Sequence, residues 1–286
     1  MSRLEKIPTK LLLALVFILL ASIIFLLRIN QKKVDTVSAW WDETWTYRQA
    51  IEIGWTGSDL TDFQVSFDIG TSALIASGKM QTDCDDIRIT DSSGNLLAHW
   101  IEEGNPGCNS PLGDTKIWTK LPSLPSTGST IYIYYGNSSA VNVENGNNVF
   151  EFFDDFETNT SSDYTITKQV VRGSGPGFIW DTANSQLKSD TSNDCLTIHT
   201  DTSLTNLYVW STAVFNGDND GVGVFIKSSS TYYEALVNSE HPTATDGIFT
   251  RTTGEPSIVS SSTNSLNCLN QTHEIGIGYD GTSFKM

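Results

Sequence analysis

The sequence predicts an all-β protein, with two antiparallel, jelly-roll-like β-sandwich domains behind one N-terminal transmembrane helix. Apolar residues alternate with polar ones, as at Ile51, Ile53 and Trp55, which is the period of a strand with one buried face. Turn-forming residues separate these runs, and Ser, Thr, Asn and Gly recur throughout. After residue 30 no apolar period of 3.6 residues persists, although residues 71–80 favour one short helix. An antiparallel sandwich fits this pattern best.

The N-terminal segment predicts contact with a membrane. Leu11 to Leu27 carries no charge and is flanked on both sides by Lys and Arg. As a helix it would be about 25 Å long, close to the lower limit for crossing a bilayer. A small-residue cleavage pattern ends at Ala39, beyond three further basic residues. We expect an uncleaved single-pass anchor in the cell membrane with the C-terminal portion outside the cytoplasm; the alternative is secretion after cleavage at Ala39.

The charge distribution argues against nucleic acid as a partner. Of the 17 basic and 33 acidic residues, six basic and two acidic ones lie within the first 39 positions. The remainder therefore holds 11 basic against 31 acidic side chains. Such a field repels phosphate backbones and anionic lipid, whose binding needs clustered Lys and Arg. A solvated surface is the main interpretation of the acidity, and cation binding is the alternative.

The four cysteines predict disulfides. None has the spacing of a zinc site, and an even number behind an export signal is typical of oxidised proteins. The pairing that respects the expected module boundary joins Cys84 to Cys108 and Cys195 to Cys268. Free buried thiols are the alternative.

The chain divides into three parts by composition. Residues 1–39 form the anchor or signal peptide with a short linker, and residues 40–148 form the first β module. Residues 149–286 form a second β module, with a strand predicted at 149–156 and later strands beginning near Tyr208, Val222, Tyr232, Gly247 and His273. We expect this second module to be incomplete at Met286, because a further strand begins just before it.

The first module resembles the domain-of-unknown-function family 2341, which occurs in bacterial and archaeal surface proteins. The resemblance covers about residues 40–138 and rests on several aromatic and acidic motifs. In chain order, these are Trp40-Trp41 with Trp45, Tyr47 and Arg48; Asp62 to Val65; Asp86-Ile87-Arg88 with Asp91 and Gly94; Trp100-Ile101-Glu102; Trp118 before Leu121-Pro122; and Tyr132 to Asn137.

The second module resembles part of a concanavalin-A-like lectin or glucanase domain. In such proteins this domain often follows the first, and it is entered through a strand rich in Phe and Asp. Phe150 to Glu157 is similar to that entry strand, and Gly223 to Phe225, Tyr232-Tyr233 and Tyr279 to Gly281 are similar to later strands. The resemblance implies a jelly roll that recognises carbohydrate.

The sequence holds no recognisable catalytic motif. Glucanases of this fold present Glu-x-Asp-x-x-Glu along one strand, so that the carboxylates enter one cleft, and no such run occurs. The four histidines are scattered and no serine lies in a nucleophile elbow. We expect no enzyme, and a glycoside hydrolase is the less favoured alternative.

One loop resembles half of a calcium site. Asp218 and Asp220 lie in a polar run that ends with Gly221, but Asn216 replaces the leading Asp and Lys227 stands at the twelfth position. No cofactor is expected. Weak calcium binding at Asp218 and Asp220 is the alternative to a plain hairpin turn.

Aromatic side chains are the remaining candidates for ligand binding, because exported β proteins stack sugar rings on exposed Trp and Tyr. The candidates are Trp40, Trp41, Trp45, Tyr232 and Tyr233, with core packing as the alternative for each group. We predict a surface protein with a binding or adhesion role whose ligand is a glycan or another surface protein. A structural spacer or assembly subunit of a surface layer is the alternative.

Overall fold

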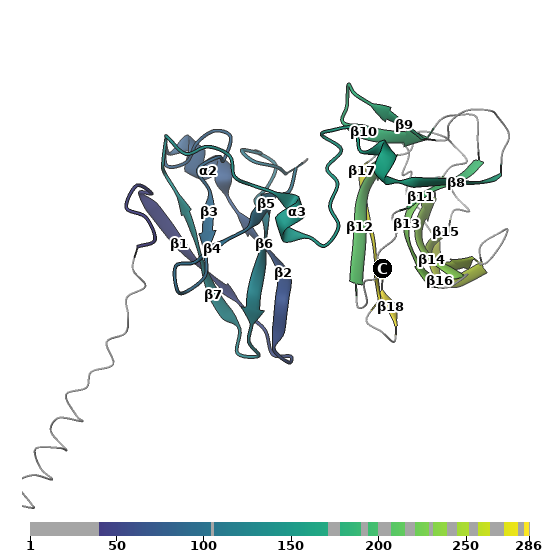
Figure 1. The fold of residues 1–286 in the computed structure, drawn as a ribbon, viewed down its shortest axis with the longest axis horizontal. Coiled ribbons are helices and arrows are strands. Elements are labelled where there is room, and N and C mark those ends of the chain that lie inside the picture. Colours follow the sequence, from purple (N-terminus) through teal and green to yellow (C-terminus); the bar gives the residue numbers. More distant parts are fainter. Residues whose placement is uncertain are drawn as a thin grey trace, which may run out of the picture. The chain divides into compact units, whose positions relative to one another are not determined.

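The computed structural model shows a chain of antiparallel sheets with few helices, which confirms the predicted all-β class (Figure 1). The chain separates into two compact units, the first ending at Asp154 and the second beginning at Asp155. Within the described part of the chain, no helix is long and apolar enough to cross a membrane. The predicted anchor, Leu11 to Leu27, lies outside that part. The described residues are 40–103, 106–170, 178–189, 194–199, 207–214, 221–228, 231–238, 245–251, 257–263, 272–279 and 283–285.

The first unit contains two antiparallel sheets, which we name after their central strands. The β7 sheet has the order β1-β7-β3-β4 and the β6 sheet the order β2-β6-β5. The strands of the β7 sheet are β1 (Tyr47–Ile53), β3 (Arg88–Thr90), β4 (Leu96–Leu97) and β7 (Ser129–Tyr135). The strands of the β6 sheet are β2 (Leu60–Ile69), β5 (His99–Ile101) and β6 (Thr115–Leu124).

Side chains of both sheets share one apolar core. Ile89, Ile131 and Ile133 of the β7 sheet and Ile117 of the β6 sheet are fully buried in the same cluster. Each such side chain contributes about 2 kcal/mol when it is removed from water. The alternation at Ile89, Ile131 and Ile133 therefore selects core-facing residues correctly. The predicted short helix is also present as α2 (Thr71–Ala76).

A disulfide joins Cys84 to Cys108, as predicted. It closes a loop of 24 residues that contains β3, β4 and β5. Cys268 and the side chain of Cys195 lie outside the described residues, so the second pairing stays a prediction.

Asp86 holds together three backbone segments of the first unit. Its side chain is fully buried, and its Oδ2 accepts hydrogen bonds from the amides of Gly136 at 2.6 Å and Asn137 at 3.2 Å. Its Oδ1 accepts from the amide of Gln81 at 3.1 Å. A buried carboxylate with several amide donors is well solvated by the protein itself. Gly136 has φ of +90°, and a Cβ there would lie 2.5 Å from the ring of Tyr47, so only glycine allows this approach.

His99 lies where the chain passes from one sheet to the other. Leu97 ends β4 in the β7 sheet, and His99 begins β5 in the β6 sheet two residues later. The imidazole is 4% exposed. Burial, and secondarily the positive charge of Arg88, lower the pKa of His99 to about 4, because both disfavour the protonated ring.

The predicted strand at 149–156 is wrong. Residues 146–149 form the short helix α3 (Gly146–Val149), and residues 150–154 continue without a strand. Phe150 and Phe153 both pack against the ring of Trp100, with centroid distances of 5.8 and 4.9 Å. Residues three apart in a strand would point to opposite faces, so this shared contact is incompatible with a regular strand over both residues.

We call residues 146–154 the strap, because they fasten the end of the first unit onto the outer face of the β6 sheet. The ring of Phe150 lies 5.4 Å from that of Trp118, the cross-strand partner of Trp100. Lys120 of β6 forms an ion pair with Glu151 at 2.8 Å. Aromatic packing therefore supplies most of the contact, and the exposed ion pair adds little.

Thr90 carries the buried side-chain atom that has no hydrogen-bond partner within the described ranges. The residue is fully buried in β3. We expect Thr90→Val to raise the free energy of unfolding by about 1 kcal/mol, because valine has the same shape and leaves no hydroxyl unsatisfied. Chemical denaturation measures the change.

Thr119 provides the matched control for Thr90→Val. It is equally buried, but its hydroxyl donates to the backbone oxygen of Ala98 at 2.7 Å. Thr119→Val should therefore lower stability by about 1 kcal/mol. Equal destabilisation by both substitutions would contradict the prediction.

In its described residues, the second unit contains two larger sheets and two separate strand pairs. The β17 sheet has the order β12-β17-β18, the β14 sheet has the order β13-β14-β15-β16, and β8 pairs with β11 and β9 with β10. The strands are β8 (Thr165–Val170), β9 (Phe178–Asp181), β10 (Gln186–Ser189), β11 (Asp194–His199), β12 (Leu207–Val214), β13 (Gly221–Ser228), β14 (Thr231–Asn238), β15 (Thr245–Arg251), β16 (Ser257–Thr263), β17 (Thr272–Tyr279) and β18 (Phe284–Lys285). A single 3-10 turn, Ser161–Asp163, precedes β8.

The β17 and β14 sheets share an apolar core. Ile275 and Ile277 of β17 are buried in one cluster with Val224 of β13 and Ala235 of β14. Because side chains alternate along a strand, Glu274, Gly276 and Gly278 occupy the opposite, outer face of β17.

Candidate ligand-binding surfaces

The three predicted tryptophans lie together at the start of the first unit. Trp45 is 8% exposed, and its indole Nε1 donates to the backbone oxygen of Asp86 at 2.6 Å. The ring of Trp41 lies 4.9 Å from that of Trp45. The indole Nε1 of Trp40 donates to the backbone oxygen of Trp45 at 2.8 Å, but 39% of Trp40 remains exposed. The cluster therefore covers the β7 sheet while leaving one ring at the surface.

Arg48 extends this cluster across the outer face of the β7 sheet. Its guanidinium lies 4.5 Å from the ring centroid of Tyr132 and 5.0 Å from that of Trp40. Tyr134, the neighbour of Arg48 across β1 and β7, is fully buried beneath Trp40 and Trp41. Such cation–π contacts contribute about 1 kcal/mol each at partly exposed sites. Most of these aromatic surfaces are thus in contact with the protein itself.

The two predicted tyrosines of the second unit lie on β14. Tyr233 is partly buried and packs against the core that the β17 and β14 sheets share. Tyr232 stands opposite Arg251 and Lys227 in the backbone register, and its side chain lies outside the described residues. Tyr233 is therefore occupied in packing.

The predicted calcium ligands, Asp218 and Asp220, also lie outside the described residues. Within the described ranges, no group of three or more His, Cys, Asp or Glu side chains could hold a metal ion. Calcium binding at the 216–221 loop stays a prediction.

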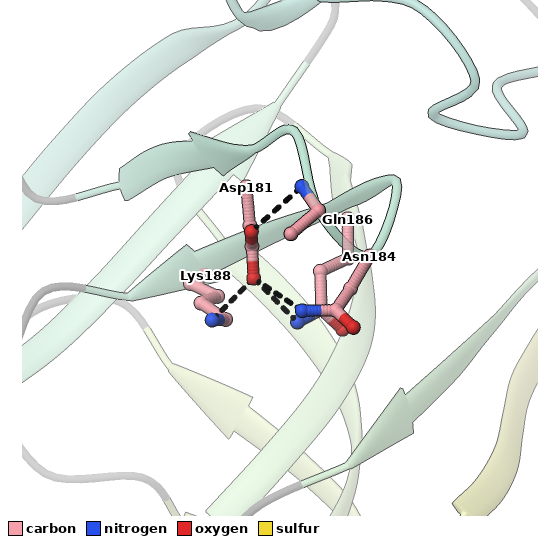
Figure 2. A network of polar contacts seen from close by, with 5 residues as sticks. Asp181, Asn184, Gln186 and Lys188 are labelled. Atoms are coloured by element: carbon pink, nitrogen blue, oxygen red, sulfur yellow. Dashed lines mark hydrogen bonds and ion pairs between the residues drawn. The ribbon is translucent and has the colours of Figure 1, made fainter.

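Figure 2 shows a network of polar contacts around Asp181, in the hairpin of β9 and β10. Its carboxylate pairs with Lys188 and accepts hydrogen bonds from Asn184 Nδ2 at 2.8 Å and Gln186 Nε2 at 3.3 Å. The bond from Lys188, followed by those from Asn184 and the amide of Ala183, lowers the pKa of Asp181. These donors all come from the same hairpin, so the network stabilises the turn.

A pair of aromatic rings lies on the outer face of the β17 sheet, and the sequence did not single it out. Tyr208 and Trp210 occupy alternate positions of β12, and their ring centroids are 5.8 Å apart with the planes inclined by 27°. Tyr208 is 55% exposed. On the opposite face of the same strand, Val209 and Ala213 pack against the core. We call Tyr208 and Trp210 the β12 platform.

Glycine on the neighbouring strand β17 allows the rings of the β12 platform to pack close to the backbone of the sheet. Trp210 stands opposite Gly276 and Tyr208 opposite Gly278 in the β12–β17 register. A Cβ added at Gly276 would lie 2.0 Å from the phenol oxygen of Tyr208 and 2.4 Å from the ring carbon that bears it. The tip of the Tyr208 ring therefore covers Gly276, while more than half of the residue remains exposed.

A sequence signal for this platform exists in two strands. In β12 (Leu207–Val214), the rings of Tyr208 and Trp210 lie on the face opposite the core, together with Thr212. The facing strand supplies Gly276 and Gly278 on the same face. Large rings opposite glycine on an outer sheet face are the combination that predicts such a surface, but it requires the register to be known.

The comparisons with known proteins support the first resemblance. Residues 83–169 match the family model described as "Domain of unknown function (DUF2341)". This stretch runs from before β3 into β8 and includes the whole strap, so it extends past the expected end of the family resemblance near residue 138. It begins well after the expected start at residue 40, and the motifs from Trp40 to Val65 lie outside it. No curated protein and no solved structure matches the chain.

Proposed function

We propose that this chain is a surface protein of the cell membrane, anchored through Leu11 to Leu27, that binds carbohydrate outside the cytoplasm. In this proposal both units are β-sandwiches, and the second is a jelly roll of lectin type without catalytic activity. The β12 platform is the observation that supports binding. The exposed surface of Tyr208 can stack on the apolar face of a sugar ring, which buries surface on both partners.

The platform makes a better ligand site than the tryptophan cluster of the first unit. Tyr208 is more exposed than Trp40, 55% against 39%. The ring of Trp40 contacts both Tyr134 and Arg48, and the ring of Tyr208 contacts Trp210 and the backbone at Gly276. Tyr208 lies on the outer face of the β17 sheet, so a ligand on its exposed surface leaves the core undisturbed.

A glycan array with the full-length protein in detergent micelles tests the proposal. We expect binding to a defined class of sugar, and we expect Tyr208→Ala with Trp210→Ala to weaken it at least tenfold, since a stacked ring contributes about 1 to 1.5 kcal/mol. Trp40→Ala serves as the matched control and should leave binding unchanged. Loss of glycan binding in Trp40→Ala alone would show that the binding site lies in the first unit.

The tightly packed tryptophan cluster favours a second candidate function, a spacer or assembly subunit of a surface layer. Trp41 and Trp45 are engaged within the first unit, as expected for a rigid module that holds another domain away from the membrane. Absence of glycan binding by the folded protein, with or without calcium, would favour this alternative.

A further inference from the structure

Glu274 stands beside the β12 platform on the same face of the β17 sheet. It is the cross-strand partner of Thr212, two pairs along the strands from Trp210 and Gly276 and therefore the next pair on that face. Both Thr212 and Glu274 are exposed. Diagonal neighbours of this kind lie about 7 to 8 Å apart at their Cα atoms, within reach of a long side chain.

We infer that the platform takes a neutral glycan, with Glu274 accepting hydrogen bonds from the sugar hydroxyls next to the stacked ring. This inference rests on the proposed function and names its ligand class. A carboxylate offers two oxygens to neighbouring hydroxyl groups, and hydrogen bonds to a charged acceptor are stronger than those between neutral groups. The rings would hold the apolar face of the sugar, while Glu274 and Thr212 hold its polar edge.

The charge of the second unit excludes acidic polysaccharides from this site. Residues 155–286 contain 15 acidic and six basic side chains. Glu274 places one of these negative charges beside the rings. A uronic acid next to it would be repelled, and the repulsion would weaken with added salt. A neutral polymer has no such penalty.

Affinity measurements on the full chain in detergent micelles test the ligand class. The neutral probes are mannan, xylan and a soluble β-glucan, and the acidic probe is polygalacturonate. We expect binding to at least one neutral polymer and none to polygalacturonate at low salt. Glu274→Gln should weaken neutral binding about tenfold, because a charged acceptor is lost. Glu157→Gln, which alters an exposed glutamate at the start of the second unit, is the matched control and should have no effect.

The outcomes separate this inference from the proposed function. Unchanged neutral binding in Glu274→Gln, with loss in Tyr208→Ala, would overturn the role of Glu274 and leave carbohydrate binding in place. Preference for polygalacturonate would overturn the neutral ligand class. No binding to any glycan by the folded protein would overturn both proposals. Circular dichroism of each variant establishes that it is folded.

Discussion

Replacing Asp86 with alanine should lower the free energy of unfolding by about 4 kcal/mol, since it removes the acceptor from three amides at once. These amides belong to Gln81, Gly136 and Asn137, and they join the loop after α2 to the segment that follows β7. No nearby water can replace the carboxylate without rearrangement, because the side chain is fully buried. Denaturant unfolding of the full chain measures the loss.

Two further variants test the origin of this effect. Asp86→Asn keeps the volume and one acceptor oxygen, so it should lose less stability than the alanine variant. Asp83→Ala removes an exposed carboxylate from the same loop and should change stability by less than about 1 kcal/mol. A similar loss in Asp83→Ala and Asp86→Ala would show that the three buried hydrogen bonds are not the cause.

Acid should destabilise the first unit through His99. Burial holds the pKa of this ring at about 4 in the folded protein, below the ordinary value of 6.5 for histidine. As the pH falls, the unfolded chain therefore takes up a proton at a higher pH than the folded protein does. The stability contributed by the neutral buried ring is complete above about pH 6.5 and is lost as the pH falls towards 4. The total difference is about 3 kcal/mol, of which about 2 kcal/mol is lost between pH 7 and pH 5.

Denaturant unfolding at pH 7 and pH 5 measures this dependence. His99→Gln has no ring to protonate, so its stability should change by about 2 kcal/mol less over the same range. His273→Gln is the matched control and should retain the dependence of the wild type. An identical pH dependence in His99→Gln and wild type would contradict the prediction.

The core of the first unit could be predicted because its strands have one buried face. Ile51, Ile131 and Ile133 alternate with polar or amphipathic residues, and this period fixes both the strand and the side that faces inward. The Cys84–Cys108 disulfide was predictable for a different reason, since sequence order leaves few pairings within a module.

The strap and several strands of the second unit could not be predicted in this way. The run from Phe150 to Phe153 has the composition of a strand, but the contact with Trp100 and Trp118 decides its conformation. That contact joins residues about 30 to 50 positions apart and leaves no local signal. Thr165–Val170 and Ser257–Thr263 are rich in polar residues, so alternation alone does not reveal them as strands.

The candidate sites show the same division between local pattern and tertiary contact. The density of tryptophan near the start of the module correctly indicated a cluster, but only the structure shows that Trp45 is buried and Trp40 is not. The β12 platform depends on the register that brings Gly276 beneath Tyr208. That register cannot be predicted from the sequence of either strand alone.

The strap also determines how the chain would respond to tension. A pull on the second unit reaches the first unit through Asp154, the last residue of the strap. The load would fall first on the rings of Phe153 and Phe150, which can peel from Trp100 one after the other while both sheets stay intact. Behind them, the Cys84–Cys108 bond limits extension even if β3 to β5 separate. The strap would thus detach from the β6 sheet first under load and could bind to it again afterwards, while both sheets of the first unit stay folded.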